Sequence, residues 1–172
     1  MKLFNWIKHA YQRITKGYSY RDLWSIDYWF LTVVPKMLQE FSEIKYIGIP
    51  CSLVAKIEAE HPEMTPDERD ELAVNTWRYT CRQMAYLLSE GLEPKDQVNE
   101  YENEYWGWDD IKKERKYGFT KDEDGEFTFT TNQDPEIAEK YHKRNMEIEK
   151  YREEQLQKGL KMFAENLETL WW

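Results

Sequence analysis

Residues 65–91 have the sequence TPDERDELAVNTWRYTCRQMAYLLSEG, and this stretch decides the fold. Thr65, Pro66 and Glu68 stand at the N-cap, first and third positions of a capping box, in which two side chains satisfy the first free backbone N–H groups of a helix. The apolar residues that follow recur at helical spacing: Leu72, Ala73, Trp77, Met84, Leu87 and Leu88. Gly91 is a typical residue for the end of a helix. The stretch therefore predicts a long helix with one buried face.

Three more helices are predicted before it. The first covers residues 2–16, carries four basic and no acidic residues, and ends at Gly17 in a left-handed cap. We expect it to pack on its own domain; binding to a membrane surface or to a partner's groove are the alternatives. The second covers residues 20–44 and is apolar on most sides, which predicts a central position. A short helix over 52–60 follows.

The chain after residue 92 changes in character. Residues 90–126 hold 13 acidic against 6 basic residues, and residues 98–116 are predicted to be helical. Phenylalanines then flank Asp124-Gly125, which predicts a β-hairpin over about residues 117–131. Asp134-Pro135 opens a last helix, predicted to run over 134–170, whose thin apolar seam predicts pairing with another helix, internally or in a homodimer.

These elements together predict a mainly α fold, a helical bundle with a small β-hairpin and a long C-terminal helix. We expect residues 1–172 to form a single helical domain in which residues 92–132 are an insertion.

Composition limits the classes of function. The net charge of −9 argues against direct nucleic-acid binding, which requires an excess of lysine and arginine. The chain begins without the apolar core of a signal peptide, and its longest apolar run is too short to span a bilayer. We therefore expect a cytoplasmic protein that binds no membrane.

Motifs for catalysis are scarce. The sequence lacks a nucleophile elbow and a glycine-rich phosphate loop, and Cys51 and Cys81 match no metal-ligand spacing. One metal site is weighed as a weak alternative, formed by two Glu-x-x-His pairs: Glu58, His61, Glu139 and His142. His61 stands at a helix end before a proline, which does not suit a bundle ligand. We expect no enzymatic activity, no cofactor and no metal.

A binding surface is predicted instead from the acidic part of the chain. Aromatic and acidic residues alternate there: Tyr101, Glu102, Glu104, Tyr105, Trp106, Trp108, Asp109 and Asp110. Aromatic anchors within an acidic rim suit an interface with a basic protein surface. The alternative is that the rings pack inward and only the carboxylates face water.

A second motif lies near the N-terminus. Residues 17–27 read GYSYRDLWSID, in which Ser19 is expected as an N-cap, Asp22 as its partner at the third helical position, and Trp24 and Asp27 as buried residues. A carboxylate buried at Asp27 would require a hydrogen-bond partner.

This segment, with the C-terminal stretch 159–171, resembles uncharacterised small accessory proteins of tailed bacteriophages, which carry a Gly-aromatic-Ser-x-x-Asp-x-Trp-x-aliphatic-Asp pattern. The resemblance implies a viral origin and transfers no activity. It favours a non-enzymatic accessory protein that binds and blocks a host protein in the host cytoplasm, as an anti-defence inhibitor does. The alternatives are a protein that sequesters a signalling nucleotide in an aromatic pocket, a metal-dependent helical-bundle enzyme, and a structural phage protein.

Overall fold

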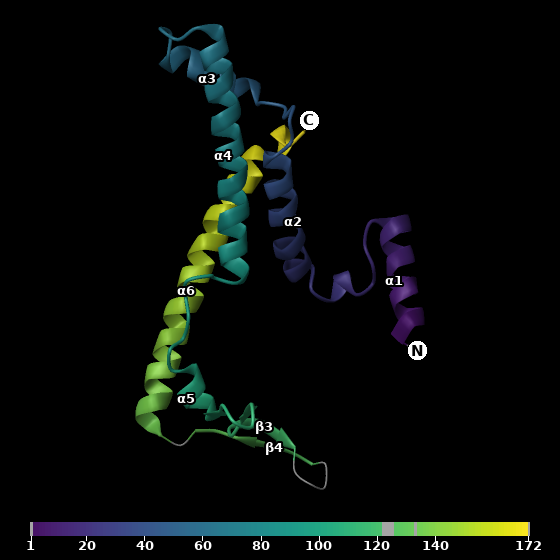
Figure 1. The fold of residues 1–172 in the computed structure, drawn as a ribbon, viewed down its shortest axis with the longest axis vertical. Helices are drawn as coiled ribbons and strands as arrows, with labels where there is room; N and C mark the ends of the chain where they lie inside the picture. The colour runs from purple at the N-terminus through teal and green to yellow at the C-terminus, as the bar shows by residue number, and fades with distance from the viewer. Residues whose placement is uncertain (1, 122–125, 133, 172) are drawn as a thin grey trace. The chain divides into compact units, whose positions relative to one another are not determined.

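The computed structural model describes residues 2–121, 126–132 and 134–171, and these are mainly helical (Figure 1). The elements in chain order are α1 (Lys2–Lys16), a 3-10 turn (Asp22–Trp24), α2 (Ile26–Ser42), α3 (Cys51–Glu60), α4 (Pro66–Leu92), α5 (Glu102–Trp106), β1 (Trp108–Asp109), β2 (Glu114–Arg115), β3 (Gly118–Lys121), β4 (Phe127–Thr130), α6 (Pro135–Asn166) and a closing 3-10 turn (Leu167–Thr169). The predicted fold class, a mainly α bundle with a small hairpin and a long C-terminal helix, is confirmed.

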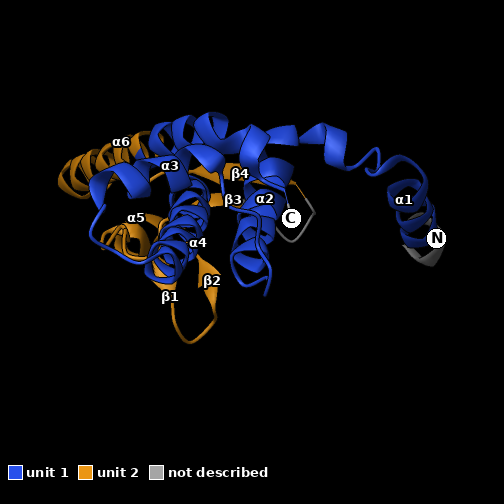
Figure 2. Ribbon diagram, turned by 90° about the horizontal axis from the view of Figure 1, so that it is seen from above, with its two compact units in different colours: residues 1–93, 155–172 blue, residues 94–154 orange. Residues whose placement is uncertain are grey.

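The chain divides into two compact units (Figure 2). Unit 1 contains residues 1–93 and 155–172, and unit 2 contains residues 94–154. Helix α6 contributes its first part to unit 2 and its last part to unit 1. Unit 2 thus begins at nearly the same place as the predicted insertion but extends beyond it into α6.

Helix α4 starts as its capping box predicts. The Thr65 hydroxyl accepts a hydrogen bond from the Glu68 backbone N–H at 3.4 Å, and the Glu68 carboxylate accepts one from the Thr65 N–H at 2.8 Å. The bond from the Thr65 backbone also lowers the pKa of Glu68. These bonds satisfy N–H groups that have no partner inside the helix.

The core of unit 1 is built around one face of α4. Five residues of that face are buried, and Leu38 of α2 and Ile47 pack on them; the α4 residues are Trp77, Cys81, Met84, Ala85 and Leu88. Helix α6 joins this core through Phe163, whose ring meets Phe30 of α2 edge-on at 5.6 Å. Apolar burial of this kind is the main favourable term in folding.

Arginines of α4 hold the carboxyl end of α2. Arg78 donates to the Ile44 carbonyl at 3.0 Å, and Arg82 donates to the Ser42 hydroxyl at 3.3 Å and to the Glu43 carboxylate at 2.7 Å. The last carbonyls of a helix lack intrahelical donors and carry partial negative charge, so guanidinium groups stabilise this end.

Two glycines bring α4 and α6 into close contact. A Cβ atom on Gly91 of α4 would lie 2.8 Å from the Leu156 Cβ of α6. A Cβ atom on Gly159 of α6 would lie 3.0 Å from the backbone nitrogen of Leu88 in α4. Only hydrogen atoms fit in these spaces, so the two backbones approach each other at both points.

Two predicted helices differ from those observed. The helix predicted over 20–44 is divided into the 3-10 turn and α2, because Ser25 is extended with φ −146° and ψ 81°. The helix predicted over 98–116 is observed only over Glu102–Trp106, because Gly107 adopts a left-handed φ of 60° and ends α5. Strands β1 and β2 then pair antiparallel, with Trp108 opposite Arg115.

The remaining elements agree with their predictions. Strands β3 and β4 form an antiparallel hairpin in which Phe119 faces Phe129, while its expected Asp124-Gly125 turn lies outside the described residues. The Asp134 carboxylate accepts the backbone N–H of Glu136 at 3.0 Å at the start of α6. The helix ends at Asn166, slightly before the predicted residue 170.

Substitution of Gly91 by alanine tests the contact between α4 and α6. Alanine favours an isolated helix over glycine, yet here its methyl group would collide with Leu156, so we expect the free energy of unfolding to fall by about 1–3 kcal/mol. Urea denaturation measures this change. Asn75→Ala, at an exposed position of the same helix, is the matched control and is expected to leave stability unchanged or raise it. A Gly91→Ala variant as stable as the parent would contradict the close approach.

Candidate binding surfaces

The predicted acidic aromatic residues separate into an inward and an outward set. Tyr105 of α5 is buried and its ring stacks on that of Tyr141 of α6, with centroids 3.9 Å apart and planes 3° from parallel. The edge of the His142 ring meets Tyr105 at 5.3 Å. Tyr105 therefore stabilises unit 2 and does not form part of an exposed surface.

Trp106 and Tyr101 are half-buried at the edge of this cluster. The Arg115 guanidinium lies 5.4 Å from the Trp106 ring centroid and also 3.4 Å from the Glu102 carboxylate. Asn99 supports the same region, because its side-chain amide donates to the Tyr141 carbonyl at 3.0 Å and to the Asn145 side chain at 2.8 Å. Glu102 is thus partly neutralised by a neighbour, whereas Glu104 is exposed.

Trp108 and Asp110 belong to the outward set. The Trp108 indole N–H donates to the exposed Asp110 carboxylate at 2.9 Å, and Trp108 is 41% exposed. Asp109 stabilises the turn between β1 and β2. Its carboxylate accepts hydrogen bonds from the backbone N–H groups of Ile111 and Lys112 at 2.9 and 3.0 Å. Ile111 at that turn is almost fully exposed.

The most exposed aromatic surface of unit 2 was not among the predicted site residues. Phe119 and Phe129 pair across the β3–β4 hairpin at 4.8 Å, and Phe127, opposite Lys121, lies on the same side of the two strands. Phe119 is 80% and Phe127 72% exposed. We name Phe119, Phe127 and Phe129 the phenylalanine face. The alternating sequence FTFT indicates it, because residues two apart in a strand share a side.

Unit 2 as a whole is acidic. Unit 2 holds 18 acidic against 11 basic residues, so seven of the nine excess negative charges of the chain belong to it. Several of these carboxylates form ion pairs with basic neighbours of the same unit, among them Glu100 and Glu147 with Arg144, and Glu102 with Arg115. Unit 2 therefore combines exposed phenylalanine rings with an acidic surface.

The four residues of the weak metal alternative have other neighbours. His61 of unit 1 lies 3.4 Å from the Glu63 carboxylate, and Glu58 is exposed. In unit 2 His142 packs on Tyr105 and Tyr141, while Glu139 is exposed. Across residues 2–121, 126–132 and 134–171, no three His, Cys, Asp or Glu side chains are grouped so that they could hold a metal ion.

The two cysteines differ in their surroundings. Cys81 is fully buried in the core, and this burial raises the pKa of its thiol to about 11, so the thiol is neutral near pH 7. Cys51 is exposed at the start of α3.

In the part of the chain that the structure describes, no helix is both long and apolar enough to cross a bilayer.

The N-terminal motif joins α1 to the 3-10 turn and does not cap a helix with Ser19. The Asp22 carboxylate accepts two bonds from the Arg13 guanidinium, at 2.6 and 3.1 Å, and the Ser19 backbone N–H at 2.8 Å. The bond from Arg13, followed by that from Ser19, holds the pKa of Asp22 far below its ordinary value. Ser19 itself is buried.

The other two motif residues are not buried as predicted. Trp24 is 91% exposed, because it lies in the 3-10 turn and not on the packed face of α2. Asp27 is exposed in the first turn of α2, since that helix begins at Ile26 rather than at Tyr20. A carboxylate in the first turn is favoured by the positive end of the helix dipole, so Asp27 needs no buried partner.

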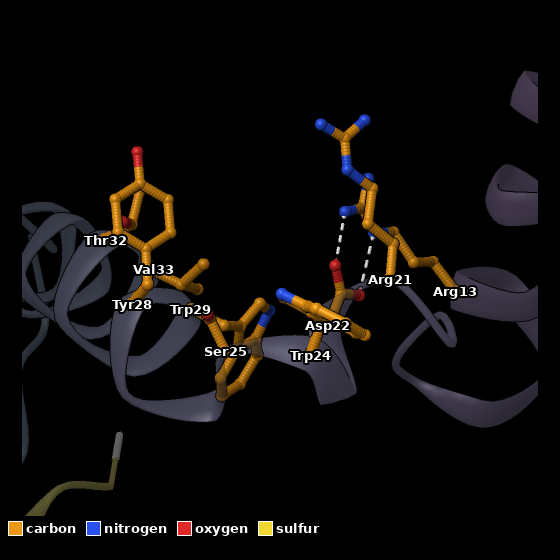
Figure 3. A pocket seen from close by; sticks show the side chains of 9 residues that line it. All are labelled: Arg13, Arg21, Asp22, Trp24, Ser25, Tyr28, Trp29, Thr32 and Val33. Atoms are coloured by element: carbon orange, nitrogen blue, oxygen red, sulfur yellow. Dashed lines mark hydrogen bonds and ion pairs between the residues drawn. The ribbon is translucent and has the colours of Figure 1, made fainter. Parts of the chain in front are cut away.

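A hollow of about 550 Å³ lies beside this motif (Figure 3). Aromatic, guanidinium and hydroxyl groups line it, from α1, the 3-10 turn and α2: Arg13, Arg21, Asp22, Trp24, Ser25, Tyr28, Trp29, Thr32 and Val33. Arg13 is engaged by Asp22, as the dashed lines of Figure 3 show. The Arg21 guanidinium and the two indole rings are the groups that a planar anion would contact.

Compared with known proteins, the chain matches no described family, no curated protein and no solved structure.

The Asp22→Asn substitution tests the tie between α1 and the 3-10 turn. We expect about 1 kcal/mol of local stability to be lost, a value kept low because Arg13 is more than half exposed. The protection factor of the Ser19 amide against hydrogen exchange, measured by NMR, should fall about fivefold. Asp27→Asn, an exposed acid five residues later, is the matched control and should leave it unchanged.

The same tie predicts a pH dependence. The pKa of Asp22 is lowered in the folded chain, so its stabilising effect is complete above the ordinary aspartate pKa near 4 and is lost as the pH falls below that value. Protection of the Ser19 amide should therefore decrease in acid in the parent but not in Asp22→Asn. Equal acid sensitivity in both proteins would contradict the assignment.

Proposed function

We propose that this chain is a binding protein, without a reaction of its own, that occupies a basic surface of another protein through unit 2. One observation carries the proposal: the phenylalanine face is exposed on a hairpin within the unit that holds most of the negative charge of the chain. Large rings that fill a partner's pocket supply most of the binding energy in interfaces of this type. The excess of carboxylates in the same unit steers encounter and selects a basic partner.

The exposure of the β3–β4 hairpin also favours binding of a partner. A two-stranded hairpin is only marginally stable by itself, and β3–β4 exposes both its phenylalanines and its Thr128 and Thr130 residues to solvent. Its exposed rings lose their unfavourable contact with water only when something covers them. A partner that covers the phenylalanine face therefore stabilises the hairpin and gains binding energy from the same contact.

The resemblance of residues 17–27 to phage accessory proteins favours a host protein as this partner. An acidic surface with protruding rings imitates the charge of a nucleic acid, so it competes for the basic site of a nucleic-acid-processing or defence protein. The proposed action is blocking of that site in the host cell, as an anti-defence inhibitor does.

Capture from a bacterial host lysate, with Phe127→Ser and Glu104→Lys compared with the parent, tests the proposal. Removal of a ring that fills a partner's pocket costs about 2 kcal/mol, so we expect the affinity for the captured protein to fall about 30-fold in Phe127→Ser. Reversal of Glu104 should slow association and weaken the dependence of binding on salt.

Matched controls come from the same unit. Met146→Ser removes an exposed apolar side chain of α6, and Glu153→Lys reverses an exposed charge of that helix. Both should bind the partner as the parent does. Asp109 is avoided because it forms the turn between β1 and β2. Binding that survives Phe127→Ser and Glu104→Lys together would refute the proposed surface.

The hollow of Figure 3 favours a second function, sequestration of a signalling nucleotide. A base can stack on the Trp24 or Trp29 indole, and a phosphate can pair with the Arg21 guanidinium.

Thermal unfolding in the presence of cyclic mononucleotides and cyclic dinucleotides tests this function. A ligand at 100 times its Kd stabilises a protein by about 2.7 kcal/mol, which raises the Tm by several degrees for a chain of this size. Arg21→Ala should abolish the shift, whereas Arg69→Ala, on α4 away from the hollow, should keep it. A flat response to the whole panel would count against sequestration.

A further inference from the structure

Helix α1 turns its polar side toward its own chain and its apolar side toward solvent. Gln12 is buried, and its side-chain oxygen accepts the Tyr20 backbone N–H at 3.1 Å. Arg13 beside it binds Asp22. Ile7, Tyr11 and Ile14, spaced four and three residues apart, form a stripe on the other side of the helix.

The stripe is exposed along its length. Ile14 is 83% and Tyr11 66% exposed, and Ile7 is also exposed. The expectation that this helix packs its apolar side on its own domain is therefore wrong for Ile7, Tyr11 and Ile14. The reason is that the contacts with residues 19–22 engage the polar side, so the apolar stripe points away from them.

Charge is segregated around this helix. Residues 1–26 hold five basic residues and one acidic residue, Asp22, which is paired with Arg13. Residues 27–172 hold 19 basic against 32 acidic residues. A basic segment in an otherwise acidic protein is attracted to an anionic surface, while the rest of the chain is repelled by it.

The aromatic residues of the segment suit an interface between water and hydrocarbon. Trp6 lies beside the apolar stripe and is exposed, as is Trp24 of the 3-10 turn. Tryptophan and tyrosine concentrate at the headgroup level of bilayers, since their rings are apolar and their N–H or O–H groups are polar. A helix with a marked apolar stripe, a basic polar side and tryptophan at its border has the composition of helices that lie in a membrane surface.

We infer that α1 docks on an anionic lipid surface, with Ile7, Tyr11 and Ile14 in the acyl boundary and Lys8 and Lys16 at the headgroups. The helix lies in the plane of the membrane surface and does not cross the bilayer. This assignment replaces the expectation that the chain binds no membrane. It is independent of the proposed binding of a protein partner by unit 2.

Flotation of the full chain with lipid vesicles tests the inference. Vesicles of phosphatidylcholine alone are compared with vesicles in which about a quarter of the lipid is phosphatidylglycerol, a composition that gives the negative surface potential of an anionic membrane. We expect binding to the anionic vesicles, little binding to the neutral ones, and release at high salt because the attraction of Lys8 and Lys16 is screened.

Two variants locate the contact, each with a matched control. Ile14→Asn should lower the partition coefficient about tenfold by removing an inserted side chain, and Lys8→Glu should lower it about tenfold by reversing a charge at the surface. Ile111→Asn and Lys36→Glu change exposed residues outside the segment and should bind as the parent does. All four positions are exposed, so the fold should tolerate the changes, which circular dichroism checks.

Other results overturn the inference. Absence of binding to anionic vesicles at low salt, or equal binding to neutral and anionic vesicles, would do so. Light scattering that shows a dimer in the parent and a monomer in Ile14→Asn, with no vesicle binding, would assign the stripe to a second copy of the chain instead.

Discussion

The close approach of α4 and α6 is the constraint through which the last part of the chain joins the core that α2 and α4 form in unit 1. Gly91 faces Leu156, and Gly159 faces the Leu88 backbone, so two helices far apart in sequence approach each other closely at both points. The chain leaves unit 1 just after Gly91 and returns just before Leu156. The contact thus lies at the place of departure and return, while the core residues Trp77 and Met84 lie on the α4 turns that precede it.

Charge is distributed unevenly along the chain. Unit 2 carries the excess of acidic residues together with exposed phenylalanines, while the first 26 residues are basic and expose an apolar stripe. Surfaces of opposite charge favour different partners, because a charged partner that attracts one surface repels the other. The proposed protein partner and the proposed lipid surface therefore rest on separate residues of the chain.

In the acidic aromatic segment, helical spacing alone does not predict which rings are buried. Tyr105 and Trp108 stand three residues apart, as neighbours on a helix do, yet Tyr105 is stacked on Tyr141 and Trp108 is exposed beyond a left-handed Gly107. Nothing in the local pattern distinguishes them, because burial of Tyr105 requires a ring supplied by α6, more than 30 residues later. The phenylalanine face could have been predicted from the sequence, because the two-residue alternation that forms it is local. Its exposure could not, because it depends on the absence of an opposing layer among the described residues.

Elements whose cause is local can be predicted from the amino-acid sequence alone. The capping box of Thr65 and Glu68, the Asp134 cap of α6, the left-handed Gly17 at the end of α1 and the β3–β4 hairpin all rest on bonds or dihedral angles within a few residues. Which sides of those elements are covered depends on contacts between distant parts of the chain. Asp22 binds Arg13 instead of capping α2, and this contact turns the apolar side of α1 outward. Amphipathic spacing shows that a helix has an apolar side, but what covers that side depends on contacts between residues that the chain brings together only when it folds.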